Sequence, residues 1–236
     1  MVKYEESLKK PFTDLKKLLI GIVLSLIPIV NLVVQGFAIE SSGVGKAKPS
    51  KSMPEWKDWW SLFIKGLASV VIKIIYMIPA LVVLTIALGL AIGDVLSTFA
   101  GTVITPEAMA QIKSGAATNE QIGMMFRENW YLILPTIIKL APIILVGLAL
   151  ALIASFLAPM AVLNYVKNKR FSAAFDFGTV FKKTLNGKYI VTWLVLVILG
   201  VVVGFLGFIP ILGSAIAMFL LSVIGYSLYG QVYREV

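Results

Sequence analysis

The sequence of 236 residues contains no cysteine and no histidine. Without cysteine the chain can form no disulfide, no thiolate metal site and no thiol nucleophile. Without histidine it lacks the most common general base and the most common metal ligand. No pair of carboxylates falls inside an apolar run, so acid–base catalysis has no evident carrier. We therefore expect a protein that is not an enzyme and that binds neither a cofactor nor a metal ion.

Charge is also scarce, because only 14% of the residues are charged and 59% are hydrophobic. Soluble domains have about 25% charged and about 45–50% apolar residues. The apolar residues here occur in runs of about 20, the length of helix that crosses a bilayer core of roughly 30 Å. The composition predicts an all-α, polytopic helical membrane protein. We expect four full spans, an N-terminal re-entrant or short helical hairpin, and three interfacial amphipathic helices.

The whole chain is expected to form one transmembrane domain over residues 1–236. In chain order we expect an interfacial helix at 1–17, a hairpin at 18–39, an interfacial helix and span at 54–92, an extracytoplasmic helical loop at 94–129, an interfacial piece and span at 130–166, an interfacial helix at 171–185 and a two-span hairpin at 189–233.

The stretch 54–66 holds three of the five tryptophans. Its apolar side chains fall at the spacing of one helical face, and they are Trp56, Trp59, Trp60 and Phe63. Lys57 and Lys65 take the other face. Ser52 and Glu55, three residues apart, predict a capping box at the start of this helix. Tryptophans on one short helix before an apolar run are typical of the membrane–water interface.

Two further stretches repeat this design of aromatic and basic side chains. Residues 3–19 carry five lysines beside an apolar stripe, and Pro11 is expected to interrupt the helix. Residues 171–185 carry Lys182 and Lys183 beside phenylalanines. We expect all three helices to contact lipid and to form a basic collar.

The run 18–39 is broken in its middle by Pro28 and Asn31. It can form one kinked span or a hairpin that returns to its starting side. The hairpin places 17 basic residues on one face of the membrane and 2 in the loop 94–129, whereas a single crossing divides the bases 7 to 12. Because cytoplasmic segments carry the excess of Lys and Arg, the count favours the hairpin, with both termini in the cytoplasm and the protein in the cell membrane. The net charge of +9 then indicates anionic lipid, with a protein partner or a homo-oligomer also open, and not nucleic acid.

Helix boundaries can be predicted for the second half of the chain as well. Thr105 predicts a helix start and Gly115 its stop, and Thr118 with Gln121 predicts a second capping box. Two prolines, Pro135 and Pro142, are expected to divide residues 130–166 into an interfacial piece and a span near 143–163.

A few polar residues lie inside apolar runs. Lys73 and Lys139 can mark a substrate or lipid-phosphate site, although snorkelling to an interface is the preferred interpretation. Asn31 and Gln35 can line a polar cavity, and closing the turn after Pro28 is the preferred role.

Glycines and turns suggest further organisation. Gly89 with Gly93, and Gly200 with Gly204, have the spacing of close helix–helix packing in membranes. The turn at 27–31 resembles the turn at 209–213, since both contain Ile-Pro-Ile, and we interpret the pair as a duplication.

One group of residues resembles the signature of a known family. It consists of Met53-Pro54-Glu55-Trp56, Asp58, Leu62, Phe63 and Gly66, preceded by Tyr4, Leu8, Pro11-Phe12, the turn at 27–31 and Gly36. The pattern is similar to that of an uncharacterised family of prokaryotic, largely archaeal, integral membrane proteins. The resemblance implies a small multi-span protein of unassigned function, with no active-site residues to transfer.

Three functions are compatible with these observations. The leading hypothesis is a non-catalytic scaffold or membrane-organising protein that binds anionic lipid or a partner through its basic amphipathic helices. The broken helix, the repeat and the two membrane lysines also fit a small-solute transporter or channel. A helper of membrane-protein insertion or assembly is the third hypothesis.

Overall fold

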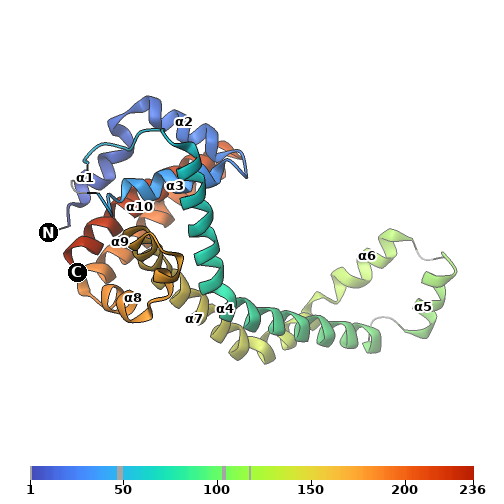
Figure 1. Cartoon of the computed structure of the whole chain (residues 1–236). Helices are drawn as coiled ribbons and strands as arrows, with labels where there is room; N and C mark the ends of the chain where they lie inside the picture. Colours follow the sequence, from blue (N-terminus) through green and yellow to red (C-terminus); the bar gives the residue numbers. More distant parts are fainter. Residues whose placement is uncertain (1, 47–49, 103–104, 117) are drawn as a thin grey trace. The chain divides into compact units, whose positions relative to one another are not determined.

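The computed structural model describes residues 2–46, 50–102, 105–116 and 118–236, with the backbone alone at 101–102, 121–122 and 125–126 (Figure 1). The described residues form helices and short 3-10 turns and no β-strand. In chain order the elements are α1 (Tyr4–Lys9), η1 (Lys10–Thr13), α2 (Leu15–Ser25), α3 (Asn31–Ser41), α4 (Trp59–Thr102), α5 (Pro106–Lys113), α6 (Asn119–Glu128), η2 (Trp130–Leu132), α7 (Ile133–Asn168), η3 (Phe171–Phe175), α8 (Phe177–Thr184), α9 (Gly187–Gly204), η4 (Phe205–Phe208) and α10 (Leu212–Glu235).

Four helical segments of the described chain are long and apolar enough to cross a membrane. They are Trp59–Ala100, Trp130–Asn168, Gly187–Phe208 and Leu212–Glu235. This confirms the predicted number of full spans and the all-helical multi-pass class. The 44 residues of α4 correspond to a length of roughly 66 Å, about twice the thickness of a bilayer core.

The chain divides into two compact units. The first, here called the core unit, comprises residues 1–76 and 154–236, and the second unit comprises residues 77–153. Helices α4 and α7 each belong partly to both units.

In the second unit the predicted boundaries are confirmed by Thr105, which accepts a hydrogen bond from the backbone of Ala108 at 3.2 Å, and by Gly115, whose φ is +71°. The side chain of Gln121 lies outside the described residues, so the second capping box stays a prediction.

The core unit is built around α10, which contacts α1, α2, α3 and α9 (Figure 1). Helix α3 lies along α10 and is buried over most of its length. The largest side chains between them, Phe37, Ile39 and Phe219, are fully buried. Burial of this apolar surface, together with close packing, holds the core unit together.

Two glycines allow α3 and α4 to approach closely. A Cβ atom added at Gly36 would overlap the backbone carbonyl of Leu62, and one added at Gly66 would overlap the carbonyl of Leu32. Contacts between small residues and a facing backbone are characteristic of helix pairs in membranes. This crossing therefore requires glycine at both positions, and both are among the residues on which the family resemblance rests.

The run 18–39 forms two helices, α2 and α3, which contact each other and are joined by a turn at residues 26–30. Each helix has 11 residues, which is about half the length needed to cross a bilayer core. Two contacting helices of this length favour the predicted hairpin over one kinked span, and its return to the starting side of the membrane stays a prediction. Pro11 interrupts the preceding helix, as predicted, because it lies in the 3-10 turn η1.

The predicted start of the tryptophan helix is wrong. Helix α4 begins at Trp59, and Asp58, with φ of +52°, caps it by accepting a hydrogen bond from the backbone of Ser61 at 3.2 Å. Glu55 instead pairs with Lys17 at 2.5 Å. Trp56 precedes the helix and stacks on Phe37. Contacts with distant segments thus override the local capping signal, and the helix continues without a break into the span.

Two other predicted boundaries are corrected. Residues 171–185 form η3 and α8 and not one helix, because Asp176 caps a new helix by accepting from the backbone of Thr179 at 3.2 Å. Helix α7 continues through Pro142, so the predicted division of residues 130–166 is wrong. Pro135 lies in the first helical turn, where its missing N–H costs no hydrogen bond.

The predicted packing of two glycine pairs is not formed. Gly89 and Gly93 have no atom within 4 Å of an added Cβ, and neither do Gly200 and Gly204. Within the described residues these helix faces are open.

Candidate functional site

Charged and polar groups from distant parts of the chain converge on the C-terminal end of α10. The backbone N–H of Lys3 donates to Gln231 Oε1 at 2.7 Å, and Lys183 Nζ donates to the carbonyl of Tyr233 at 2.9 Å. Lys188 forms an ion pair with Glu235 at 2.7 Å. The last carbonyls of a helix carry partial negative charge, which attracts cations to this end.

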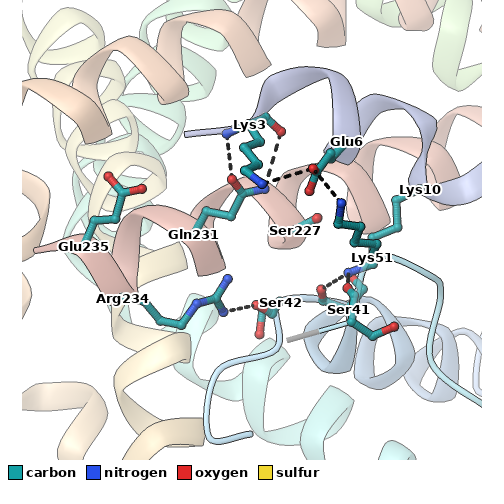
Figure 2. Close-up of a pocket in the computed structure, with 11 residues that line it drawn as sticks. Lys3, Glu6, Lys10, Ser41, Ser42, Lys51, Ser227, Gln231, Arg234 and Glu235 are labelled. Carbon is teal, nitrogen blue, oxygen red and sulfur yellow. Dashed lines mark hydrogen bonds and ion pairs between the residues drawn. The ribbon is translucent and has the colours of Figure 1, made fainter. Parts of the chain in front are cut away.

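A cavity of about 390 Å³ opens beside this helix end (Figure 2). Its walls come from α1, η1, the end of α3, the loop near residue 50 and the last turns of α10. Four basic and two acidic side chains line it, namely Lys3, Lys10, Lys51, Arg234, Glu6 and Glu235. The charged side chains thus carry a net positive charge, and the serines at 41, 42, 50 and 227 add polar surface. We call this site the basic cavity.

Lys10 is the buried cation of the basic cavity, with only 5% of its surface exposed. Its Nζ donates to the carbonyls of Ser41 at 2.7 Å and Ser50 at 3.0 Å. Burial lowers the pKa of Lys10 to about 8, and the nearby charges of Lys46 and Arg234 contribute to this shift. Removing a charged ammonium from water is costly, so a lysine held here without a carboxylate is an unusual feature.

The carboxylates of the basic cavity are engaged with other cations. Glu6 lies 3.2 Å from Lys3 Nζ and 3.3 Å from Lys51 Nζ. Arg234 donates from Nη1 to the carbonyl of Ser42 at 2.6 Å (Figure 2). Among the described residues, neither Lys10 nor Arg234 forms an ion pair with a carboxylate.

A polar ladder joins α1 to α10 next to the basic cavity. The hydroxyls of Ser7 and Ser227 lie 3.0 Å apart, and Gln231 Nε2 donates to Ser7 Oγ at 2.8 Å. Ser7 is fully buried, and satisfied polar groups of this kind fix the pairing of helices in an apolar bundle. The ladder therefore positions the wall that carries Lys3 and Lys10.

The basic cavity presents hydrogen-bond donors and an excess of positive charge. Its cations offer several N–H donors beyond those used for the carbonyls. The described residues contain no cluster of three or more His, Cys, Asp or Glu side chains that could hold a metal ion. Among the described residues, Lys10 Nζ donates to backbone carbonyls, and Ser41 Oγ donates to the carbonyls of Ala38 and Val223.

A second cavity of about 540 Å³ lies near the start of α4. Glu40 accepts hydrogen bonds from both Lys46, at 2.6 Å, and Lys65 in its wall. Trp60 and Ile64 give it an apolar side, and Lys169 adds a third lysine. Glu40, the one acidic side chain among its described lining residues, is thus already paired with two lysines, and the cavity is more apolar than the basic cavity.

The aromatic residues predicted for the interface divide into two groups. Trp56 stacks on Phe37 with ring centroids 3.8 Å apart, and its Nε1 donates to the carbonyl of Lys17 at 3.3 Å. Trp59 and Trp60 are exposed, the latter by 72%, and Phe63 stacks on Trp60 at 5.7 Å. Trp56 and the half-buried Phe63 therefore pack against the core, and Trp59 and Trp60 form the exposed surface.

The predicted lysines also differ in their surroundings. Lys57 and Lys182 are exposed. Lys65 is bound to Glu40. Lys183 lies over the ring of Tyr233 at 4.1 Å and caps the end of α10, so it contributes a cation–π contact as well as a hydrogen bond.

The polar residues predicted inside the membrane do not form one site. Asn31 donates from Nδ2 to Met218 Sδ at 3.4 Å, while its buried Oδ1 has no hydrogen-bond partner among the described residues. Gln35 is buried. Lys73 lies over the ring of Tyr226 at 5.6 Å. None of these residues lines the basic cavity.

Lys139 lies in the second unit and is paired. Its Nζ lies 2.6 Å from Asp94 Oδ1, and Thr136 Oγ1 donates to Asp94 Oδ2 at 2.5 Å. The carboxylate joins α7 to α4 through this pair. Asp94, which the sequence places at the end of an apolar run, therefore neutralises the membrane lysine.

Sequence reasoning missed the residues of the basic cavity. Lys9 and Lys10 are adjacent lysines, and no local sequence pattern indicates that Lys10 is buried while Lys9 is exposed. Arg234 gives a weak signal, since it is the one basic residue in α10.

Comparison with known proteins identifies the family of this chain but no characterised relative. No curated protein and no solved structure matches it. A family model described as "Protein of unknown function (DUF4013)" matches residues 20–212. The chain belongs to this DUF4013 family of proteins of unknown function.

Proposed function

We propose that this protein is a non-catalytic, membrane-organising scaffold that binds anionic lipid through the basic groups around the C-terminal end of α10. In this proposal both termini lie in the cytoplasm, in the cell membrane. The exposed residues Trp59, Trp60, Lys57 and Lys182 contact the membrane–water interface.

The convergence of basic segments on one helix end carries this proposal. The N-terminal segment, the loop after α3, α8 and the start of α9 all bring lysines or hydrogen-bonding groups to the last turns of α10. Cations gathered at one end of a multi-span protein attract anionic head groups, by about 1 kcal/mol for each Lys or Arg near the surface.

The two alternative functions have less support. A transporter or channel needs polar side chains around a shared cavity at membrane depth, and Asn31, Lys73 and Lys139 occupy three different environments. No specific observation favours a helper of membrane-protein insertion.

Lipid selectivity of the full chain tests the proposal. The protein is purified in a maltoside detergent with an equimolar mixture of phosphatidylglycerol and phosphatidylcholine, and the retained lipids are counted by mass spectrometry. We expect enrichment of phosphatidylglycerol that decreases with salt, because surface attraction is screened. The double variant Lys183→Gln/Lys188→Gln, at the end of α10, should lose part of the enrichment, and Lys113→Gln, in the predicted outer loop, should not. Equal retention of the two lipids by the wild type contradicts the proposal.

Sidedness has its own test, because the chain contains no cysteine. Single cysteines at the exposed positions Ser52, Ser114 and Ser172 can be labelled with a membrane-impermeant maleimide in cells and in inverted vesicles. We expect Ser52→Cys and Ser172→Cys to react from the cytoplasmic side and Ser114→Cys from the outer side. Labelling of all three from one side contradicts the proposed topology.

A further inference from the structure

Lys10 and Arg234, the two principal cations of the basic cavity, have more N–H donors than the hydrogen bonds that they form with the described residues. An ammonium has three N–H donors and a guanidinium has five. Two donors of Lys10 and one of Arg234 are used by carbonyls of the described residues. Carbonyls carry only partial charge, so these contacts do not neutralise the positive charge of either cation.

Charge balance indicates how many negative charges the ligand carries. Four bases and two acids line the basic cavity, so its charged side chains carry a net charge of +2. A carboxylate or a phosphodiester brings one negative charge, whereas a terminal phosphate brings about −1.5 to −2 at pH 7, with three strong acceptor oxygens. The planar guanidinium fork matches two of these oxygens.

We propose that the basic cavity binds a terminal phosphate group, as free phosphate or as the phosphomonoester head group of a lipid, with Lys10 and Arg234 as its ligands. This names the ligand class of the site on which the proposed function rests. The volume of about 390 Å³ leaves room for a phosphate and the first atoms of the group that carries it. Ser41 and Ser42, which already bind the two cations through their carbonyls, hold them on one wall.

Glu6 limits anion binding in this arrangement. Its carboxylate lies in the cavity lining and occupies both Lys3 and Lys51. Removal of its charge adds one positive charge to the site and frees two ammonium groups. Because 37% of the Glu6 side chain is exposed, Glu6→Gln is expected to fold normally. The proposal thus predicts that Glu6→Gln binds phosphate more tightly than the wild type and that a variant without Arg234 binds it more weakly.

Calorimetric titration of the full chain in a maltoside detergent with inorganic phosphate tests this inference. We expect Arg234→Gln to weaken binding about tenfold or more, since a charge-assisted bidentate contact is lost. Glu6→Gln should strengthen binding by about threefold to tenfold, because like charge is removed from the site. Lys113→Gln is the matched control, an exposed lysine that does not line the cavity, and its affinity should equal that of the wild type. Thermal unfolding of each variant shows that it is folded.

A competition arm separates the two sources of the phosphate. Displacement of inorganic phosphate by phosphatidic acid, but not by phosphatidylcholine, supports a lipid phosphomonoester. Phosphate binding that phosphatidic acid does not affect supports a free anion. The inference is overturned if neither compound binds the wild type, or if Glu6→Gln binds no better than the wild type. If phosphatidylglycerol is still enriched in that case, the phosphate site fails while the proposed function stands.

Discussion

Helices α9 and α10 form one hairpin and are both long and apolar enough to cross a membrane, yet they differ greatly in burial. In the apolar window of each span, 6% of the residues of α9 and 56% of those of α10 are buried. Helix α9 is mostly aliphatic, whereas α10 also carries Ser227 and Gln231, which form hydrogen bonds with Ser7 of α1. Lipid tails are as apolar as leucine, so hydrophobicity alone does not bring a helix into a bundle. Small and polar residues do, because they allow close approach and interhelical hydrogen bonds.

The glycines of the two helices show the same contrast. A Cβ atom at Gly230 of α10 would overlap the backbone carbonyl of Ser42, whereas Gly200 and Gly204 of α9 face no atom within 4 Å. Spacing in the sequence favours α9 as the packing helix, since Gly200 and Gly204 form the recognised motif. A glycine at a helix–helix contact is therefore identified by the backbone that faces it in the structure and not by its spacing in the sequence.

The largest effect is expected where the packing around α10 meets the tryptophan segment. Trp56 stacks on Phe37, which in turn lies 6.1 Å from Phe219 of α10. Trp56→Ala should lower the free energy of unfolding by about 3 kcal/mol, since a stacked and half-buried indole is removed. Thermal unfolding in detergent measures this loss. Trp60→Ala, with 72% of Trp60 exposed, is the control and should change stability little. Equal losses of unfolding free energy in the two variants would contradict the assignment of Trp56 to the core and of Trp60 to the exposed surface.

The next effect compares the two helices directly. Gly230→Ala should destabilise the protein by about 2 kcal/mol, because the methyl group overlaps a backbone carbonyl that cannot move easily. Gly200→Ala should stabilise it by about 0.5 kcal/mol, since alanine is the better helix former and has open space. Unfolding temperatures of the two variants, measured in one detergent, should move in opposite directions. A shift in the same direction would remove the distinction between α9 and α10.

The pH dependence of anion binding sharpens the role of the α10 end. Lys10, with a pKa of about 8, is charged below that pH in the free protein, and a bound anion holds it charged to higher pH. Binding therefore takes up a proton above pH 8, and affinity should fall there by up to about tenfold per pH unit. Sulfate is the probe, because it remains a dianion throughout the range. Its affinity is measured by calorimetry from pH 7 to pH 9.5.

Lys10→Arg provides the control for this titration, since a guanidinium stays charged over the whole range. The other charged groups near Lys10 are unchanged in this variant, and they are Lys3, Glu6, Lys46, Lys51, Arg234 and Glu235. The α-amino group, which ordinarily titrates near 8, is also unchanged. A fall in affinity that persists in Lys10→Arg would assign it to another group.

The smallest effect concerns the turn that joins α9 to α10. Ile211 has φ of +62° and ψ of −62°, and the backbone N–H of Leu212 donates to the carbonyl of Pro210 at 2.6 Å. This is a γ-turn of the rare, strained kind. Ile211→Gly should raise the free energy of unfolding by about 1 kcal/mol, since glycine adopts positive φ without strain. Ile209→Gly, at a φ of −87°, should not stabilise the protein, and thermal unfolding of both distinguishes them.

The two similar turns illustrate what sequence comparison can predict. The segments at 27–31 and 209–213 share Ile-Pro-Ile, and both join two helices. Val30, which precedes α3, has helical φ and ψ, whereas Ile211, which precedes α10, has positive φ. The shared proline predicts a break in both places, because proline cannot donate a helical hydrogen bond. The geometry of each break depends on the helices that follow, and the proposed duplication stays a prediction.

Several features were determined by the residues alone. Apolar runs long enough to cross a bilayer predict the four spans, and local signals at Pro11, Thr105 and Gly115 predict the breaks and ends that the structure contains. Each of these features depends on residues that are close together in the sequence. Hydrophobic length, proline geometry and N-capping act within one or two helical turns.

The tertiary structure alone decided the position of Trp56, the burial of α10 and the basic cavity. Lys10 is held by carbonyls 31 and 40 residues further along the chain, and Arg234 by one 192 residues before it. No periodicity links such positions, because the energy of a buried charge depends on the groups that surround it in space. The sequence by itself therefore determined a multi-span helical protein with an excess of basic residues, and the packing of α1, α3 and α10 decided where two of its cations could meet an anion.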